Sequence, residues 1–437
     1  MLGFVLALSF AVALVVLGDL RANAAEAVAL LTMWGVGVLA IRPRGGRPRD
    51  ILLAALAIRG VLLFSPPTLS DDLYRYLWEG RAALMGGNPY LHAPSAAVWP
   101  SDPIRALVNH PDISSIYPPT AVWGFALVGA LWYHPLAIKA TMGLLDALVA
   151  WALAGVLVGR RRSLAGAWLY ALHPLAAVES AGSGHLEPAA LLCLVLAIRS
   201  WDRGGSGIVW AGLGGLIKLL PLTLLAALWR RAPHHLAVVA LLVVVTAAPF
   251  VDAGLLLGRG LGTYTQHWSF NASLFSLLER ALAEWARPVA VALGAAVSLL
   301  ALLRRSDPAA VALWIGGAFV LLSPTVHPWY IAWAWVPALI CGVRAWSLLA
   351  TLAPLSYAVL VTYDPATGRW EEPWWPVWVQ YVPFLGVMVW EFGVHLTRPG
   401  PWAPGRADSG SLSPSLTRRG PSTPAPPSTP SARDSPT

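Results

Sequence analysis

The chain has 437 residues, of which 57% are hydrophobic and only 12% are charged, with a formal net charge of +8 and a mean hydropathy of +0.61. A single soluble core cannot bury so much apolar surface, so the composition excludes an ordinary water-soluble domain and indicates a protein that crosses a membrane several times. The positive charge is divided among short loops rather than gathered in one block, which argues against a nucleic-acid partner.

Apolar segments alternate with short loops along most of the chain. At about 20 residues a span, the length allows roughly 12 transmembrane helices, so we expect an all-α integral membrane bundle of about 12 spans. The segments are 2–18, 26–41, 51–65, 136–158, 164–179, 188–199, 236–251, 288–303, 309–323, 329–343, 345–361 and 377–396. Several are shorter than an untilted span requires, so their boundaries are expected to shift by several residues.

Arginine marks one side of the membrane, because it is concentrated in a subset of the loops. These arginines are Arg42, Arg44, Arg47, Arg49, Arg160, Arg161, Arg162, Arg199, Arg203, Arg230, Arg231, Arg304, Arg305 and those from Arg398 onward. The positive-inside rule assigns their loops to the cytoplasm. Counting spans then places both termini in the cytoplasm and places residues 66–118, 180–187, 252–287, 324–328 and 363–376 on the outer side.

Two regions follow from this division. We expect a transmembrane domain over residues 1–398, with a large first extracytoplasmic loop at 66–118 and a second at 252–287. The remaining residues, 399–437, are rich in proline, serine and threonine and show no apolar periodicity. That composition predicts a disordered cytoplasmic tail.

Residues 119–133 are apolar, but counting them as a span would break the alternation of loops between the cytoplasmic and outer sides of the membrane. A full span there would move Arg160, Arg161 and Arg162 to the outer side, against the positive-inside rule. We therefore interpret this stretch as a short segment embedded on the outer side.

Residues 207–229 begin and end beside basic loops and carry Lys218 and Pro221, together with three closely spaced glycines, in an otherwise apolar run. This pattern predicts a broken or re-entrant hairpin. Non-helical backbone at membrane depth is tolerated where it lines a cavity or is buried in protein, so a hairpin of this kind fits a binding site. The alternative is a single glycine-rich helix whose lysine reaches toward the interface.

The outer loop at 66–118 begins with an acidic pair. Ser70 is a good N-cap, Asp71 and Asp72 occupy the first turn, and the glycines at 86 and 87 end the helix, which predicts a short interfacial helix over 71–84. Adjacent carboxylates on a helix diverge, so only one of them enters any given cavity. The helix dipole alone also favours acidic residues in a first turn, without any function.

The first loop and four other segments, taken in order, resemble the bacterial membrane glycosyltransferases of the GT-C superfamily. The segments are 70–90, 116–119, 182–187, the Lys218/Pro221 hairpin and 327–330, so the resemblance covers about 50–345. The chain is most similar to the polyprenol-phosphate-mannose-dependent mannosyltransferases. The resemblance implies a catalytic base in the first outer loop, which maps to Asp71 with Asp72 as the alternate. The related pattern commonly has aspartate before a Gly-Arg pair, where this chain has Glu79.

The resemblance also implies a lipid-linked sugar phosphate as donor, and the outer side offers groups to bind it. Candidates for the donor phosphate are Arg75, Arg81, His185, Lys218 and His327. Candidates for the sugar or acceptor are Tyr74, Trp78, Glu79, Asn88, Tyr90, Tyr117, Glu187, His267, Trp329 and Tyr330. For the aromatic residues the alternative is ordinary interfacial anchoring. We expect no cofactor and no metal, although a divalent cation at the acidic pair is an alternative.

We therefore expect an inverting glycosyltransferase of the bacterial inner membrane, with its active site extracytoplasmic. It would move a sugar, mannose by resemblance, from a polyprenyl-phosphate carrier to a glycan or glycolipid acceptor, with membrane lipid as its other partner. One base suffices for a direct displacement at the anomeric carbon, which inverts the configuration. The alternative is a secondary transporter or lipid flippase, whose broken helices and intramembrane lysine look the same.

Overall fold

The computed structural model describes residues 1–230, 232–304, 307–364, 367 and 370–397. The predicted tail at 399–437 and the basic residues Arg231, Arg305 and those from Arg398 onward lie outside these residues. Regular structure in the described part is helical, apart from isolated bridges such as that between Phe270 and Thr325. The prediction of an all-helical protein is thus confirmed.

The α-helices differ widely in length, from single turns to 25 residues. They are α1 (Leu2–Leu17), α2 (Ala24–Ile41), α3 (Pro48–Leu62), α4 (Asp72–Leu84), α5 (Pro119–Leu131), α6 (Pro135–Gly159), α7 (Ala165–Leu172), α8 (Pro174–Ala177), α9 (Glu187–Arg199), α10 (Gly205–Ile217), α11 (Leu225–Leu228), α12 (Leu236–Ala247), α13 (Arg259–His267), α14 (Leu274–Leu282), α15 (Ala286–Arg304), α16 (Pro308–Leu322), α17 (Ala332–Cys341), α18 (Ala345–Leu352) and α19 (Trp375–Thr397).

Short turns of other helical types connect or extend these helices. The π-helical turn is η2 (Val178–Gly182), and the 3-10 turns are η1 (Arg105–Leu107), η3 (Trp201–Arg203), η4 (Leu220–Leu224), η5 (Pro233–His235), η6 (Ala248–Gly258), η7 (Ala283–Trp285), η8 (Pro328–Ile331) and η9 (Ala353–Thr362). The second predicted outer loop, 252–287, is therefore mostly helical rather than irregular.

Six helical stretches in the described part are long and apolar enough to cross a membrane. They are Ala24–Ile41, Pro135–Gly159, Pro233–His267, Leu274–Arg304, Ala345–Thr362 and Trp375–Val394. Several further apolar helices, of 10–17 residues, are shorter. These helices mark the chain as a membrane protein, whereas a total of about 12 spans stays a prediction.

The apolar segment 164–179 is not one continuous helix, and its assignment as a span stays a prediction. The helix stops at Leu172, and a new turn starts at Pro174. Proline has no amide hydrogen, so it opens a helix easily but cannot continue one. The His173 ring accepts a hydrogen bond from the amide of Leu175 at 3.2 Å and caps the new turn. The apolar composition of this stretch concealed the break.

The hairpin interpretation of 207–229 is confirmed. Helix α10 ends at Ile217, Lys218 is extended (φ −142°, ψ 131°), and η4 and α11 then return along α10. The close return depends on glycine, because a Cβ at Gly215 would lie 2.4 Å from Leu222 Cδ2. A single continuous helix is excluded. Lys218 therefore lies at a break between two helical arms.

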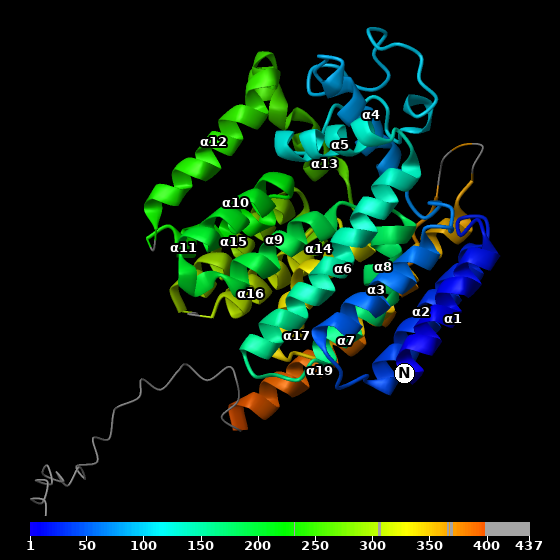
Figure 1. Cartoon of the computed structure of the whole chain (residues 1–437), viewed down its shortest axis with the longest axis vertical. Helices are drawn as coiled ribbons and strands as arrows, with labels where there is room; N and C mark the ends of the chain where they lie inside the picture. The colour runs from blue at the N-terminus through cyan, green and yellow to red at the C-terminus, as the bar shows by residue number, and fades with distance from the viewer. Residues whose placement is uncertain (231, 305–306, 365–366, 368–369, 398–437) are drawn as a thin grey trace, which may run out of the picture.

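The ends of the molecule differ in character. Figure 1 shows α1, α2, α3 and α6 side by side, with α4, α5 and the loop between them at the end away from the N-terminus. One basic loop contacts the ends of two other helices: Arg160 Nη2 lies 2.7 Å from Oδ1 of Asp307, the N-cap of α16, and Arg162 donates to the carbonyl of Ile340, near the end of α17, at 2.7 Å. The separation of basic loops from the first large loop agrees with the predicted sidedness, while the assignment of the cytoplasmic side remains a prediction.

The contact between α4 and α5 is tight enough to test. A Cβ at Gly80 would lie 2.5 Å from the Ala126 nitrogen, so we expect Gly80→Ala to destabilise the protein by about 1–3 kcal/mol. Gly124→Ala on α5 is the matched control, because nothing lies within 4 Å of its Cβ position. Thermal unfolding in detergent should show a lower midpoint only for Gly80→Ala. Equal midpoints for the two variants would contradict this packing.

Candidate functional site

The two adjacent aspartates at the start of α4 face different partners. Asp71 is the N-cap and its Oδ1 lies 2.9 Å from Arg21 Nη2, in the turn between α1 and α2. Asp72 Oδ1 accepts a hydrogen bond from Asn109 Nδ2 at 2.9 Å, and its Oδ2 lies 3.9 Å from His185 Nε2. The helix over 71–84 is confirmed to within one residue. Its geometry places Asp72, rather than Asp71, beside the predicted histidine.

His185 is held by the π-helical turn η2, immediately before it. Its amide donates to the Glu179 carbonyl at 2.9 Å, and its ring Nδ1 lies 3.1 Å from Glu179 Oε2. Gly184 has φ +77°, a left-handed conformation that residues with a Cβ rarely adopt. The turn reverses at this glycine, which brings the ring of His185 back over the side chain of Glu179. Inserted π turns of this kind occur frequently at functional sites.

Trp329, in η8, lies between two histidine rings. Its ring centroid is 3.6 Å from that of His185, with an interplanar angle of 23°, and 4.5 Å from that of His327, with an angle of 6°. Trp329 itself is 7% exposed and His185 is fully buried. The indole therefore fixes the plane of both imidazoles, and residues more than 140 positions apart in the chain share one stack.

Lys218 reaches the same region from the break after α10. Its ammonium group pairs with Glu187 Oε1 and lies 4.9 Å from the ring centroid of Tyr330. The Tyr330 hydroxyl lies 3.1 Å from that of Tyr264. Among the described residues, the second oxygen of Glu187 has no hydrogen-bond partner. The lysine therefore has a charged partner and an aromatic wall beside Asp72.

The electrostatics of this cluster favour a charged carboxylate. Burial alone would raise the pKa of Asp72, but His185, the Asn109 hydrogen bond, His327 and Lys218 together lower it below its usual 3.8. Burial would also lower the pKa of His185, but contact with Glu179 and the charges of Asp72 and Glu187 raise it above 6.5. Burial lowers the pKa of His327 to about 3, so His327 is neutral at pH 7. Lys218 and the raised pKa of His185 both favour a negatively charged Asp72.

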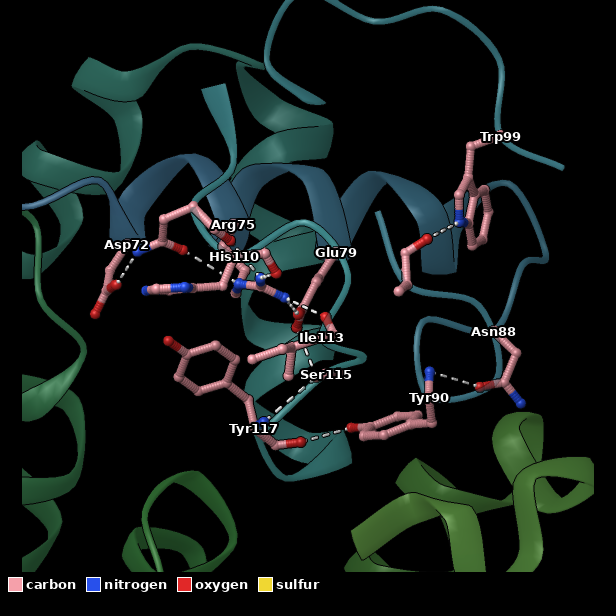
Figure 2. A network of polar contacts seen from close by, with 12 residues as sticks. Asp72, Arg75, Glu79, Asn88, Tyr90, Trp99, His110, Ile113, Ser115 and Tyr117 are labelled. Atoms are coloured by element: carbon pink, nitrogen blue, oxygen red, sulfur yellow. Dashed lines mark hydrogen bonds and ion pairs between the residues drawn. The ribbon is translucent and has the colours of Figure 1, made fainter. Parts of the chain in front are cut away.

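A second set of predicted residues holds the first outer loop together instead (Figure 2). Arg75 is 4% exposed and donates to the carbonyls of Asn109, His110 and Ile113 at 2.5, 2.8 and 3.0 Å. Glu79 is fully buried and accepts hydrogen bonds from Arg75 at 3.3 Å and from Ser115. Burial raises the pKa of Glu79 above its usual value. These groups face their own loop rather than a phosphate.

Other predicted residues also pack inside or beside this loop. The Tyr90 hydroxyl donates to the Tyr117 carbonyl at 2.7 Å, and Asn88 accepts from the Tyr90 amide at 3.0 Å. Trp78 is 3% exposed, with its ring edge-on to Trp99 at 5.2 Å. The aromatic residues thus form a packed support under α4.

Three predicted residues lie away from the cluster around Asp72. Arg81 stacks over Tyr133 at 4.6 Å and lies 3.6 Å from Asp102. Tyr74 is partly buried beside Asp71, and burial together with that charge raises the pKa of its phenol. His267 is exposed on α13, where its Nδ1 lies 2.9 Å from the Thr263 carbonyl.

The structure adds Glu179, Tyr357 and Asn109 to the candidate site. Glu179 closes an apolar segment, and a carboxylate at such a position is the signal in the sequence that could have identified it. Tyr357 donates to both oxygens of Glu179, at 2.9 and 3.0 Å, and nothing in its own segment marks it. Within the described residues no group of three or more histidine, cysteine, aspartate or glutamate side chains is arranged to hold a metal ion.

Comparison with known proteins gives one relationship. No family model matches the chain, so the resemblance to the GT-C superfamily stays a prediction. The chain is 25% identical over 419 residues to alpha-(1->6)-mannopyranosyltransferase A of Mycobacterium tuberculosis (strain ATCC 25618 / H37Rv). The alignment covers 80% of this chain and 78% of that protein. The similarity is distant, but it extends over most of both chains.

The role of Arg75 in holding the first loop can be measured directly. Arg75→Lys keeps the charge but loses the fork of donors, so we expect faster hydrogen exchange over residues 109–115. Arg81→Lys is the control, because the Arg81 side chain is 49% exposed and has fewer partners. Hydrogen-exchange mass spectrometry of both variants should show the increase only for Arg75→Lys. If the exchange rate of residues 109–115 is unchanged in Arg75→Lys, Arg75 does not hold this loop.

Proposed function

We propose that the protein is an inverting glycosyltransferase that moves a sugar, mannose by its relationship, from a polyprenyl-phosphate carrier to an extracytoplasmic glycan or glycolipid acceptor. The observation that carries the proposal is the position of the Asp72 carboxylate, whose Oδ2 lies 3.9 Å from His185 Nε2 and whose pKa is lowered by His185 and Lys218 among other groups. The nearly full-length similarity to a mannosyltransferase supports glycosyl transfer as the reaction class.

Asp72 has the properties of the proposed base. Its side chain is 25% exposed, and Asn109 holds Oδ1 while Oδ2 remains available on the side of His185. The acceptor hydroxyl would give its proton to this carboxylate as its oxygen attacks the anomeric carbon. The bond between that carbon and the phosphate oxygen then breaks, and its electron pair leaves with the phosphate. A single displacement inverts the anomeric configuration.

The leaving phosphate needs hydrogen-bond donors rather than an acid. The Nε2 of His185 makes no hydrogen bond to any described residue, and it faces the same side as Asp72. Lys218 is the second donor and would exchange Glu187 for the phosphate when the carrier binds. Tyr330, beside Lys218, supplies an aromatic wall for a sugar ring, whereas the faces of Trp329 are covered by His185 and His327. The predicted donors Arg75 and Arg81 are left out of this set, because they face their own loop.

The choice of base predicts different effects for the two aspartates. With purified protein, polyprenyl-phosphate-mannose and candidate acceptors, we expect Asp72→Asn to lower kcat by about 10²–10⁴-fold, the usual contribution of a general base. Asp71→Asn should retain turnover within about tenfold, because its partner is the surface residue Arg21. The assay measures glycosylated product. Full turnover by Asp72→Asn would remove this base.

The same assay separates the proposal from its rival. A transporter or flippase would move the carrier lipid across a vesicle membrane and leave it chemically intact, whereas transfer releases the bare polyprenyl phosphate. Mass spectrometry of the lipid after incubation should show that release in an acceptor-dependent manner. Vesicle translocation of intact donor without release would favour transport.

We also propose that turnover does not need a metal ion. The positive charges that a phosphate requires come from His185 and Lys218, which are already close to Asp72. Treatment with a chelator should therefore leave the rate of product formation unchanged. A loss of activity that a single divalent cation restores would contradict this.

A further inference from the structure

The ring of His185 has a carboxylate on each side, and only one of these belongs to the proposed reaction centre. We propose that Glu179 is a positioning residue: it holds Nδ1 of His185 so that Nε2 is turned toward Asp72 and the donor phosphate. The inference rests on the proposed function for the role of His185, while the contact itself is independent of that function.

The geometry supports a dedicated partner. Glu179 Oε2 lies 3.1 Å from His185 Nδ1, a close ion pair whose atoms are not aligned as a hydrogen bond, and the Glu179 side chain is 9% exposed. Tyr357 donates to Oε1 and Oε2 at 2.9 and 3.0 Å, so the carboxylate is held from η9 as well as by its own π turn. A buried carboxylate with only these partners is costly unless it is paired with a charge. His185 is the group in contact that can supply that charge.

Five titratable or charged side chains surround His185. They are Asp72 from α4, Glu179 from η2, Glu187 from α9, Lys218 from the break after α10 and His327 before η8. Three are acidic and one, His327, is neutral at pH 7 because burial lowers its pKa to about 3. This balance favours an imidazole that is protonated on both nitrogens, and an imidazole in that form donates from Nε2.

A small cavity lies on the inner side of this contact. It has about 20 Å³ of space for the centre of a water molecule, which is enough for roughly one water. Its polar lining comes from Asp146, Glu179, Ser180, His185 and Glu187. The Nδ1 atom is itself buried, so it faces Glu179 Oε2 rather than bulk solvent. Glu179 is the carboxylate nearest to Nδ1, and Glu187 and Asp146 line the same cavity.

The first test uses Glu179→Gln, which keeps the shape and the acceptor for Tyr357 but removes the charge. We expect kcat/KM to fall by about 10–100-fold, the usual effect of losing an outer-shell partner. In wild type, activity should fall as pH rises through the raised pKa of His185, above 6.5. In Glu179→Gln the fall in activity should occur at lower pH, because burial of His185, which lowers its pKa, is then opposed by one carboxylate fewer. Glu391→Gln, at the Arg344 backbone near α18, is the matched control and should leave the profile unchanged.

The second test does not depend on activity. A histidine whose pKa is raised by folding stabilises the native state fully below its unfolded value, about 6.5, and loses this contribution as pH rises through the folded pKa. The unfolding temperature of wild type should therefore exceed that of Glu179→Gln by more at pH 6 than at pH 9. In a His185→Gln background this pH-dependent difference should disappear.

The two tests fail separately. An inactive wild-type protein that still shows the pH-dependent stability difference would overturn the proposed function and leave the Glu179 contact supported. Suppose instead that wild type turns over, that Glu179→Gln shows the same pH profile, and that the two proteins differ in unfolding temperature by the same amount at pH 6 and pH 9. This result would overturn the positioning role alone. A shift of the pH limb in Glu391→Gln as large as that in Glu179→Gln would also overturn it, because the effect would then be nonspecific.

Discussion

The site depends on one constraint: charges placed among apolar helices must compensate each other. Asp72, His185 and Glu179 meet this condition together, because the imidazole lies 3.9 Å from one carboxylate and 3.1 Å from the other. Buried charges that lack a partner cost several kcal/mol, so a contact of this kind restricts how the surrounding helices can pack. Lys218 and Glu187 form a second compensated pair beside it.

Several side chains of the candidate site lie on backbone that is not regular α-helix. Glu179 lies on a π turn, His185 follows a left-handed glycine, Lys218 is at a helix break and Trp329 is in a 3-10 turn. Each departure from a regular α-helix frees a side chain from its helical direction. Such backbone is stable within a membrane protein only where protein surrounds it or it lines a cavity, which is where these segments lie.

The first outer loop serves as a scaffold more than as a source of ligands. Arg75 and Glu79 are buried within it, and Arg75 donates to three carbonyls across the loop. This arrangement holds Asp72 at the start of α4 with its side chain 25% exposed. The distant relationship to a mannosyltransferase supports glycosyl transfer, and the proposed site adds a carboxylate beside a histidine and a lysine.

The sequence by itself determined the membrane class and the helix over 71–84, and it offered a break at Lys218 as one of two interpretations of 207–229. These features depend on composition and on helix-breaking residues such as Pro221, which act on neighbouring residues in the chain. They can therefore be predicted without knowledge of tertiary contacts. The helix break at Pro174 was missed, because a uniformly apolar stretch hides one proline cap. Only the tertiary structure decided which aspartate faces the histidine, that Arg75 bonds to its own loop, and that Glu179 contacts both His185 and Tyr357. Those outcomes depend on which helix faces meet between residues far apart in the chain, and local sequence patterns do not record that.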